Sequence, residues 1–325
     1  MAGWRIFRGD GARHDDLTQL PAPPPWRFSR EWHPIEPAPA GVDHSEAHRA
    51  APFIASEPMI RAVNAALYLR RPLLLTGKPG TGKSTLISKV ADELQLGPVL
   101  RWPISSRSTV RQGVYEYDAV GRLQAREDDE TSIEDFLTLG PLGAALAVRG
   151  RPAALLVDEI DKSDLDFAND LLNVIEEGEY EIPELRRFKR AQTVSLRDPF
   201  NRSVEVERGQ LRAEHFPFVI MTSNADREFP AAFLRRCVRL DISPPDPEQL
   251  ARIISSQLAS HQSTLAPQEV NAVIDAFLQA SGEVSTDQLL NAIFLTVAMH
   301  DKPARTFDDA ELHELRTTLL RPIGA

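Results

Sequence analysis

One stretch of this sequence combines glycines, a lysine and hydroxyl side chains at a spacing that suits phosphate binding. It comprises Gly77, Lys78, Pro79, Gly80, Thr81, Gly82, Lys83, Ser84 and Thr85. The glycines let the backbone turn its N–H groups toward phosphate oxygens, and the helix expected to follow adds partial positive charge at its N-terminus. At this spacing Lys83 reaches the β and γ phosphates of a nucleotide, and the Ser84 hydroxyl coordinates Mg²⁺. The stretch therefore predicts a loop that binds a nucleoside triphosphate.

Two carboxylates end a second, apolar segment. Residues 153–157 are Ala-Ala-Leu-Leu-Val, and Asp158 and Glu159 follow them directly. We expect Asp158 to bind in the Mg²⁺ shell and Glu159 to orient or deprotonate an attacking water. A kinase transfers phosphate to a bound hydroxyl, whereas a water-activating carboxylate predicts hydrolysis. The pair therefore favours an enzyme that hydrolyses a nucleotide over a kinase.

Polar residues also lie next to two later apolar segments. Asn224 ends one of them, and it would hold the attacking water together with Glu159 if the two strands are neighbours; taken alone, it is more typical of a turn. Arg235 and Arg236 precede the last segment. Where neighbouring subunits pack in a ring, such an arginine reaches the next nucleotide and neutralises charge in the transition state.

Five short apolar segments are expected to position these residues as strands. They are residues 72–76, 98–104, 153–158, 218–222 and 237–242. Helical stretches separate most of them, which favours a parallel sheet covered on both faces by helices. The polar stretch 180–216 contains two alternating runs on either side of residues 198–201, and we interpret it as an inserted β-hairpin.

Composition divides the chain into three parts. Residues 1–50 form an arm with seven prolines between Pro21 and Pro39 and three of the four tryptophans. We expect the arm to dock on its own core or on a neighbouring subunit, with a disordered tail as the alternative. Residues 51–243 are predicted to be the nucleotide-binding domain. After it, strand signals stop and helix signals begin, so residues 244–325 are predicted to be a small helical domain.

Charge and hydropathy restrict the compartment and the partners. Acidic residues number 47 and basic ones 37, a net charge of −10 that disfavours general nucleic-acid binding. The longest apolar run, 292–299, is too short for a bilayer, and no apolar secretory segment opens the chain, so we expect a cytoplasmic protein without membrane contact. The single cysteine, Cys237, suits a reducing compartment and is interpreted as a packing residue. The basic segment 185–190 is typical of a solvated loop.

Taken in this order, the elements resemble those of the AAA+ ATPases. Within that family the chain resembles the MoxR-like group, and especially its branch associated with von Willebrand A domain proteins. The resemblance extends over about residues 51–300, and the most specific segments are 115–123, 139–143, 158–162, 167–173 and 229–237.

This resemblance implies a fold and an assembly. The fold is the P-loop NTPase αβα sandwich, with a parallel five-stranded sheet, an inserted β-hairpin and a C-terminal helical lid. The assembly is a hexameric ring with ATP and Mg²⁺ bound between subunits. Residues 115–126 correspond to the family's insert in the second helix and 180–216 to its hairpin before sensor 1, and both would face the axis of the ring or one of its ends.

The resemblance also assigns roles to residues by position. They fall on Lys83 and Ser84 or Thr85 in Walker A, Asp158 and Glu159 in Walker B, Asn224 at sensor 1, and Arg236 or Arg235 as the arginine finger. Arg236 is the better match for the finger. The lid helix that begins at Glu283 departs from the family pattern, because it has no basic residue where many members carry the sensor 2 arginine. Arg252 and Lys302 are the candidate substitutes.

The implied function is that of an ATP-driven remodelling or assembly chaperone. Its client would be a protein, such as one with a von Willebrand A domain. The alternative is a nucleic-acid motor or defence-system ATPase resembling the McrB branch, in which Arg186, Arg187, Lys189 and Arg190 touch phosphate. A nucleotide-dependent scaffold with negligible turnover is a third hypothesis, which the intact pair of Asp158 and Glu159 disfavours.

Overall fold

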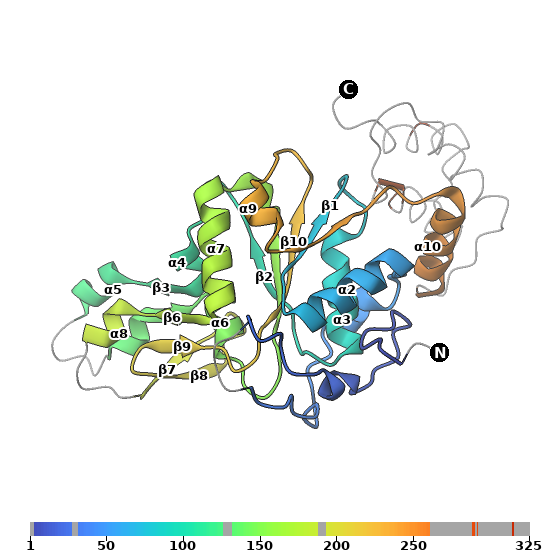
Figure 1. Cartoon of the computed structure of the whole chain (residues 1–325). Coiled ribbons are helices and arrows are strands. Elements are labelled where there is room, and N and C mark those ends of the chain that lie inside the picture. Colours follow the sequence, from blue (N-terminus) through green and yellow to red (C-terminus); the bar gives the residue numbers. More distant parts are fainter. Residues whose placement is uncertain are drawn as a thin grey trace, which may run out of the picture. The chain divides into compact units, whose positions relative to one another are not determined.

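A computed structural model of the chain describes residues 3–27, 32–125, 132–187 and 193–260, and the single residues 288, 289, 291 and 314 (Figure 1). The chain divides into two compact units. The first comprises Met1–Ala50, Ala55–Thr76 and Ser84–Leu240, and the second Ala51–Ile54, Gly77–Lys83 and Asp241–Ala325. Most of the predicted lid, including Lys302 and all but one residue of the sensor 2 segment 283–288, lies outside the described residues.

A five-stranded sheet contains all the strands that the sequence predicts. They are β1 (Leu73–Thr76), β2 (Leu100–Pro103), β5 (Ala154–Asp158), β10 (Phe218–Ser223) and β11 (Val238–Asp241), in the spatial order β11-β1-β10-β5-β2. Strand β10 pairs in parallel with β1 and β5, and β2 pairs in parallel with β5. Strand β10 is buried along its whole length, as expected of a parallel strand covered on both faces. The predicted fold class is confirmed.

Helices cover both faces of this sheet. Helices α2 (Glu57–Leu69) and α3 (Lys83–Glu93) lie on one face, and α6 (Pro141–Ala147) and α7 (Leu165–Glu177) on the other (Figure 1). The Asp164 side chain accepts the N–H of Phe167 at the start of α7, and Gly178 ends the helix in the left-handed conformation. In the second unit, α10 (Pro247–Ser260) lies within residues 244–325, the part of the chain predicted to be helical.

A second sheet is larger than the predicted hairpin. Its six strands are β3 (Tyr115–Tyr117), β4 (Leu137–Leu139), β7 (Thr193–Arg197), β8 (Ser203–Glu207), β9 (Gln210–Arg212) and β6 (Glu179–Glu181), in that spatial order. Antiparallel β7 and β8 are the predicted hairpin. Because β4 pairs with β7, the two inserts of the sequence build one sheet together.

Short helical segments complete the described structure. They are α1 (Ala47–Ala50), α4 (Val110–Val114), α5 (Ala119–Gln124), α8 (Pro183–Arg187), α9 (Ala231–Leu234), and the 3₁₀ turns at Asp16–Gln19, Ile133–Phe136 and Ile160–Lys162. Among the described helices, none has the length and apolar character that crossing a membrane requires.

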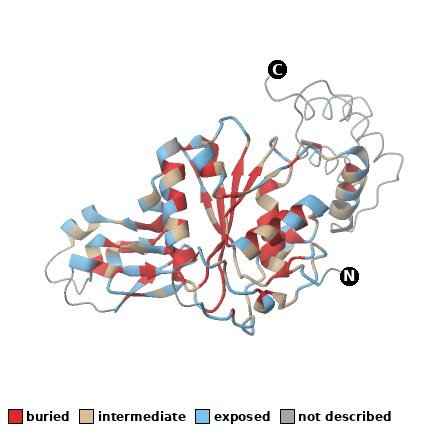
Figure 2. Cartoon of the chain, in the orientation of Figure 1, coloured by how far each residue is buried: buried red, intermediate tan, exposed pale blue. Residues whose placement is uncertain are grey.

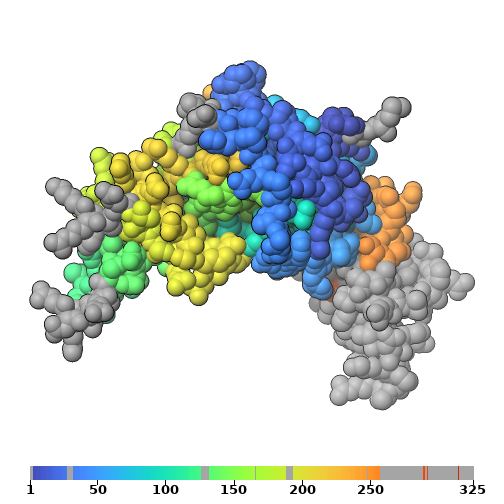
Figure 3. All heavy atoms as spheres, turned by 90° about the horizontal axis from the view of Figure 1, so that it is seen from below, coloured from blue at the N-terminus to red at the C-terminus, as the bar shows by residue number. Residues whose placement is uncertain are grey.

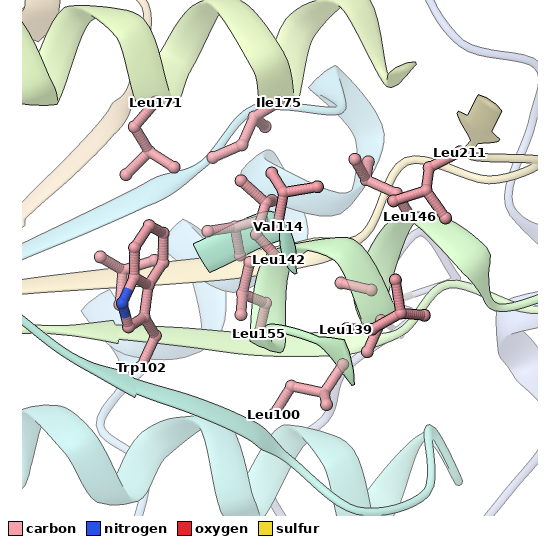
Figure 4. Packing of buried hydrophobic residues seen from close by; sticks show 14 of the residues in the cluster. Leu100, Trp102, Val114, Leu139, Leu142, Leu146, Leu155, Leu171, Ile175 and Leu211 are labelled. Atoms are coloured by element: carbon pink, nitrogen blue, oxygen red, sulfur yellow. The ribbon is translucent and has the colours of Figure 1, made fainter. Parts of the chain in front are cut away.

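One apolar core connects the two sheets. Leu155 of β5, Leu142 of α6 and Leu211 of β9 belong to the same buried cluster (Figure 4), and Figure 2 shows buried residues in both sheets. Gly140 and Gly143 allow α6 to approach α4 closely. A Cβ on Gly143 would lie 2.0 Å from the carbonyl oxygen of Val114, and one on Gly140 would be almost as close to backbone. The second sheet is therefore fixed to the first by tight backbone packing.

The N-terminal arm packs on the core of the first unit. Asn64 on α2 accepts the N–H groups of Ile6 and Phe7 at 2.7 and 3.1 Å, and Phe7 is fully buried. The buried carboxylate of Glu93 on α3 accepts three further N–H groups from residues 8–11. Figure 3 shows the arm in blue across one face. For the described residues, the expectation that the arm docks on its own core is confirmed and that of a disordered tail is wrong.

Candidate active site

The phosphate loop connects β1 to α3. Gly77, Gly80 and Gly82 have φ angles of +142°, +76° and +82°, conformations that favour glycine. The ammonium group of Lys83 donates to the carbonyl oxygens of Gly77 and Lys78 at 2.6 and 2.8 Å. Lys83 is only 7% exposed. The loop therefore has the backbone conformation predicted from its glycines and holds the lysine against its own carbonyl groups.

Other residues of the loop stabilise its shape. The Thr81 hydroxyl donates to the carbonyl oxygen of Lys78 at 2.9 Å. Phe53, which the sequence did not single out, lies so close to Gly82 that a Cβ there would be 2.8 Å from its ring. Pro79 lies in the loop, and Thr85 lies within the first turn of α3.

Side chains from α3, β5 and β10 meet at the carboxyl edge of the five-stranded sheet. The Ser84 hydroxyl donates to Oδ1 of Asp158 at 2.7 Å. The Thr222 hydroxyl donates to the same oxygen at 2.5 Å and accepts the N–H of Glu159 at 2.9 Å. Thr222 thus connects the two acidic residues, a role that sequence reasoning missed because the pairing of β10 with β5 is not visible in the sequence.

Glu159 has an unusual backbone conformation. Its φ and ψ angles, +59° and +49°, lie in the left-handed region, which costs a non-glycine residue about 1 kcal/mol. Its carboxylate is 39% exposed and accepts a hydrogen bond from the ammonium group of Lys162 at 2.5 Å. This hydrogen bond raises the pKa of Lys162. A strained backbone with an accessible carboxylate is typical of functional sites rather than of packing.

Asn224 lies at the same edge of the sheet. Strand β10 runs beside β5, with Met221 opposite Val157, so the condition that the two strands are neighbours is met. The Asn224 N–H donates to Oδ2 of Asp161 at 2.9 Å. Asp161 is 7% exposed and was not singled out from the sequence. Its buried carboxylate fixes the backbone at Asn224 relative to the end of β5.

The two candidate finger arginines differ in their surroundings. Arg236 donates from Nε to Oε2 of Glu176 and from Nη2 to Asn173, both at 2.8 Å. Burial alone would raise the pKa of Glu176, but hydrogen bonds from Arg236 and Arg27 bring it below its ordinary value. Arg235 is exposed, and its guanidinium group has no partner among the described residues. One arginine is therefore held by its own subunit and the other is exposed to solvent.

The remaining basic candidates are only partly described. Arg186 on α8 pairs with Glu181 at 2.7 Å, and Arg187 is exposed. Lys189 and Arg190 lie outside the described residues. Arg252 is exposed on α10 in the second unit.

Comparison with protein families gives a decisive match. The model of the AAA domain (dynein-related subfamily) matches residues 72–237, a range that contains the phosphate loop, Asp158, Glu159, Asn224 and both arginines. This chain belongs to the AAA domain family. As an AAA+ ATPase it has a nucleotide-binding domain of the expected type, and the N-terminal arm lies outside the matched range.

Two solved structures are among those similar to this chain. One is domain III of the replication initiation protein DnaA from Thermotoga maritima, with 15% identity and a TM-score of 0.48 over 87% of this chain and 100% of that chain. Another is the FIGL-1 AAA domain in complex with ADP, with 17% identity and a TM-score of 0.40 over 78% of this chain and 73% of that chain. Neither is similar enough to indicate a more specific function. The search of curated proteins found no match.

Proposed function

We propose that this AAA+ protein hydrolyses ATP in a hexameric ring of the MoxR-like type and uses the energy to remodel or assemble a protein client. The observation that carries the proposal is the convergence of Ser84, Asp158, Thr222 and the Glu159 backbone at one edge of the sheet. Hydroxyl and carboxylate groups held in this way belong to an enzyme that positions a water against a phosphate, rather than to a passive nucleotide binder.

The residues around this cluster have distinct roles in the proposed reaction. The loop from Gly77 to Thr85 binds the triphosphate, and Lys83 neutralises charge on the β and γ phosphates. Glu159 accepts a proton from the attacking water while Asn224 orients that water. The water oxygen bonds to the γ phosphorus, and the bond from phosphorus to the bridging oxygen breaks to release ADP. Thr222 accepts the N–H of Glu159 and so fixes the position of the backbone from which the Glu159 carboxylate extends.

The donor groups at this edge fit Mg²⁺. Ser84 and Asp158 offer a hydroxyl and a carboxylate oxygen next to each other, and Mg²⁺ prefers oxygen ligands. When bound, Mg²⁺ would neutralise phosphate charge, with Ser84 and Asp158 as its ligands from the protein.

The arginine finger would act on the neighbouring subunit. Arg236 is the proposed finger. Its hydrogen bonds to Glu176 and Asn173 hold its guanidinium group on its own subunit. Arg235 is the alternative, because its exposed side chain does not have to break contacts within its own subunit before it reaches the next site. Replacing each with alanine in turn distinguishes them, because loss of a true finger lowers turnover by about 10³-fold or more.

The second sheet favours a protein client over nucleic acid. Three exposed apolar residues lie on it or beside it: Val120 and Leu123 of α5 are 63% and 86% exposed, and Phe200 at the β7–β8 turn is 41% exposed. We propose that these side chains contribute to the surface that contacts the client. In contrast, Arg186 of the basic segment is already paired with Glu181. A von Willebrand A domain protein is the client class that the MoxR-like resemblance implies.

A nucleotide-dependent capture experiment tests this proposal. Glu159→Gln would bind ATP without hydrolysing it and serve as a trap, and Lys83→Ala would serve as the control that does not bind nucleotide. We expect one protein from nuclease-treated lysate of the source cells to be retained by the trap with ATP and not by the control. Equal retention by both variants would contradict the proposal. Capture lost on nuclease treatment, with salt-sensitive retention of DNA without it, would favour the nucleic-acid motor instead.

A further inference from the structure

One carboxylate joins the N-terminal arm to the proposed arginine finger. Oε1 of Glu176 on α7 accepts a hydrogen bond from Nη1 of Arg27 in the arm at 2.7 Å. Its other oxygen, Oε2, accepts two hydrogen bonds from Arg236, one from Nε at 2.8 Å and one from Nη2. The two arginines therefore share the carboxylate of Glu176: Arg27 bonds to Oε1, and Arg236 bonds to Oε2.

Burial makes this arrangement more than a surface ion pair. The Arg27 side chain is 9% exposed, and those of Glu176 and Arg236 are 24% and 23% exposed. A guanidinium group as buried as that of Arg27 is costly unless it is paired. The arm thus brings a nearly buried cation to the residue that holds Arg236. Arg27 also lies outside the residues 72–237 that match the family, so the family's known residues do not explain it.

We propose that Arg27 is a positioning residue that acts through Glu176 to set the orientation of Arg236. The proposal rests on the proposed function, in which Arg236 stabilises charge in the site of the next subunit. With Arg27 bonded to Oε1, Arg236 bonds to Oε2 alone. Without Arg27, the flat guanidinium group of Arg236 can bond to both oxygens at once, which is the stronger geometry. Arg236 would then stay on its own subunit and stabilise the transition state next door less well.

The first experiment measures turnover by the whole protein. Arg27→Met removes the cation and keeps much of the side-chain length. We expect its kcat to fall about tenfold, the effect of one charge-assisted hydrogen bond, with the KM for ATP nearly unchanged because the phosphate loop is intact. Arg27→Lys, which returns a cation to Oε1, should recover most of the loss. If Arg27 only stabilised the fold, its replacement by methionine would not lower kcat while leaving KM unchanged. Replacement by lysine would then also not restore kcat.

A matched control comes from the same arm. Arg5 pairs with Glu57 on α2 through two hydrogen bonds at 2.9 and 3.0 Å and does not touch α7. Arg5→Met should leave kcat unchanged. If Arg27→Met does not fold well enough to assay, Arg27→Gln can replace it, and its neutral donor to Oε1 should give a smaller loss in the same direction.

The second experiment tests whether Arg27 of one subunit affects ATP hydrolysis in the site of the neighbouring subunit. Glu159→Gln subunits are mixed in excess with a little wild-type chain, so that each wild-type site has a Glu159→Gln neighbour that still presents Arg236. When the Glu159→Gln subunits also carry the Arg236→Ala substitution, most of the ATP hydrolysis by the wild-type subunits should be lost. Adding Arg27→Met should reduce it about tenfold, and adding Arg5→Met should not change it.

The outcomes separate the two proposals. If Arg236→Ala has no effect on its neighbours, the proposed finger is wrong and Arg27 loses its role with it. If Arg236→Ala acts on its neighbours and Arg27→Met does not, the proposed function stands and the inference about Arg27 is wrong. An unchanged kcat for homogeneous Arg27→Met would also overturn the inference.

Discussion

The two sheets of the first unit are built on different principles. In the three central strands of the five-stranded sheet, β1, β10 and β5, apolar residues follow one another, and β10 is buried at all six positions. The second sheet consists of strands of three to five residues in which exposed and buried positions alternate, as in β7. Its strands come from two inserts that are distant in the chain. The first sheet is therefore specified locally by its residues, whereas the second depends on pairing between distant segments.

The two sheets also differ in the side chains that they position. The carboxyl edge of the five-stranded sheet bears Asp158, Glu159 and Thr222, which need rigid support from buried strands. Beside the second sheet, Leu123 of α5 and Phe200 of the β7–β8 turn are exposed to solvent. We interpret the first sheet as the site of chemistry and the second as the surface for a client. Changes in each sheet should therefore have separable effects.

Among changes at the carboxyl edge of the five-stranded sheet, the largest effect is expected from Glu159→Gln. A general base contributes about 10²- to 10⁴-fold to rate, so kcat should fall by that order while ATP affinity is retained. The thermal midpoint should not fall, because the replaced carboxylate is 39% exposed and supports no core. Phosphate release and equilibrium binding of a fluorescent ATP analogue measure the two quantities. Near-normal turnover would assign the base to another residue.

A smaller effect is expected from Thr222→Val, which keeps the shape of the side chain and removes its hydroxyl. The N–H of Glu159 then loses its acceptor and Asp158 loses a donor. A buried group left unpaired costs about 1–3 kcal/mol, so kcat should fall about 10- to 100-fold. Thr222→Ser keeps the hydroxyl and should retain most activity. If valine and serine gave the same rate, the hydroxyl would have no role.

Residue types and spacing indicated which residues form the framework of the candidate site. The phosphate loop, Asp158 and Glu159 could be recognised because each motif is contiguous and adjoins an apolar strand. Thr222, Lys162 and Asp161 were missed, because their roles depend on which strands are neighbours. In the second sheet, β6 is only Glu179–Glu181, and so short a strand has no periodic signal of its own. It forms because β9 pairs with it.

The junction between the sheets offers a change that acts on stability rather than on chemistry. Gly143→Ala would place a Cβ 2.0 Å from the carbonyl oxygen of Val114, so α6 must shift. Overpacking of this kind costs about 1–3 kcal/mol, and the thermal midpoint should fall by several degrees. Gly3→Ala is the control, because a Cβ there has no neighbour within 4 Å. Equal midpoints for the two variants would show that the junction is not tightly packed.

The smallest effect is expected at Cys237, which the structure confirms as a packing residue, 7% exposed. Burial raises the pKa of its thiol to about 12. The reactive thiolate is therefore scarce at pH 8, and a thiol reagent should modify the folded protein very slowly but the urea-unfolded protein readily. Mass spectrometry measures both rates. Rapid modification of the folded protein would show that the core under β11 opens easily.

The most direct test of the division between the sheets combines client capture with ATP hydrolysis. Val120→Ser with Leu123→Ser changes only exposed side chains of α5. The double variant should hydrolyse ATP at the wild-type rate, and in the Glu159→Gln background it should no longer retain the ATP-dependent client. Full retention of the client, or loss of hydrolysis with the fold intact, would contradict the assignment of chemistry to one sheet and client binding to the other.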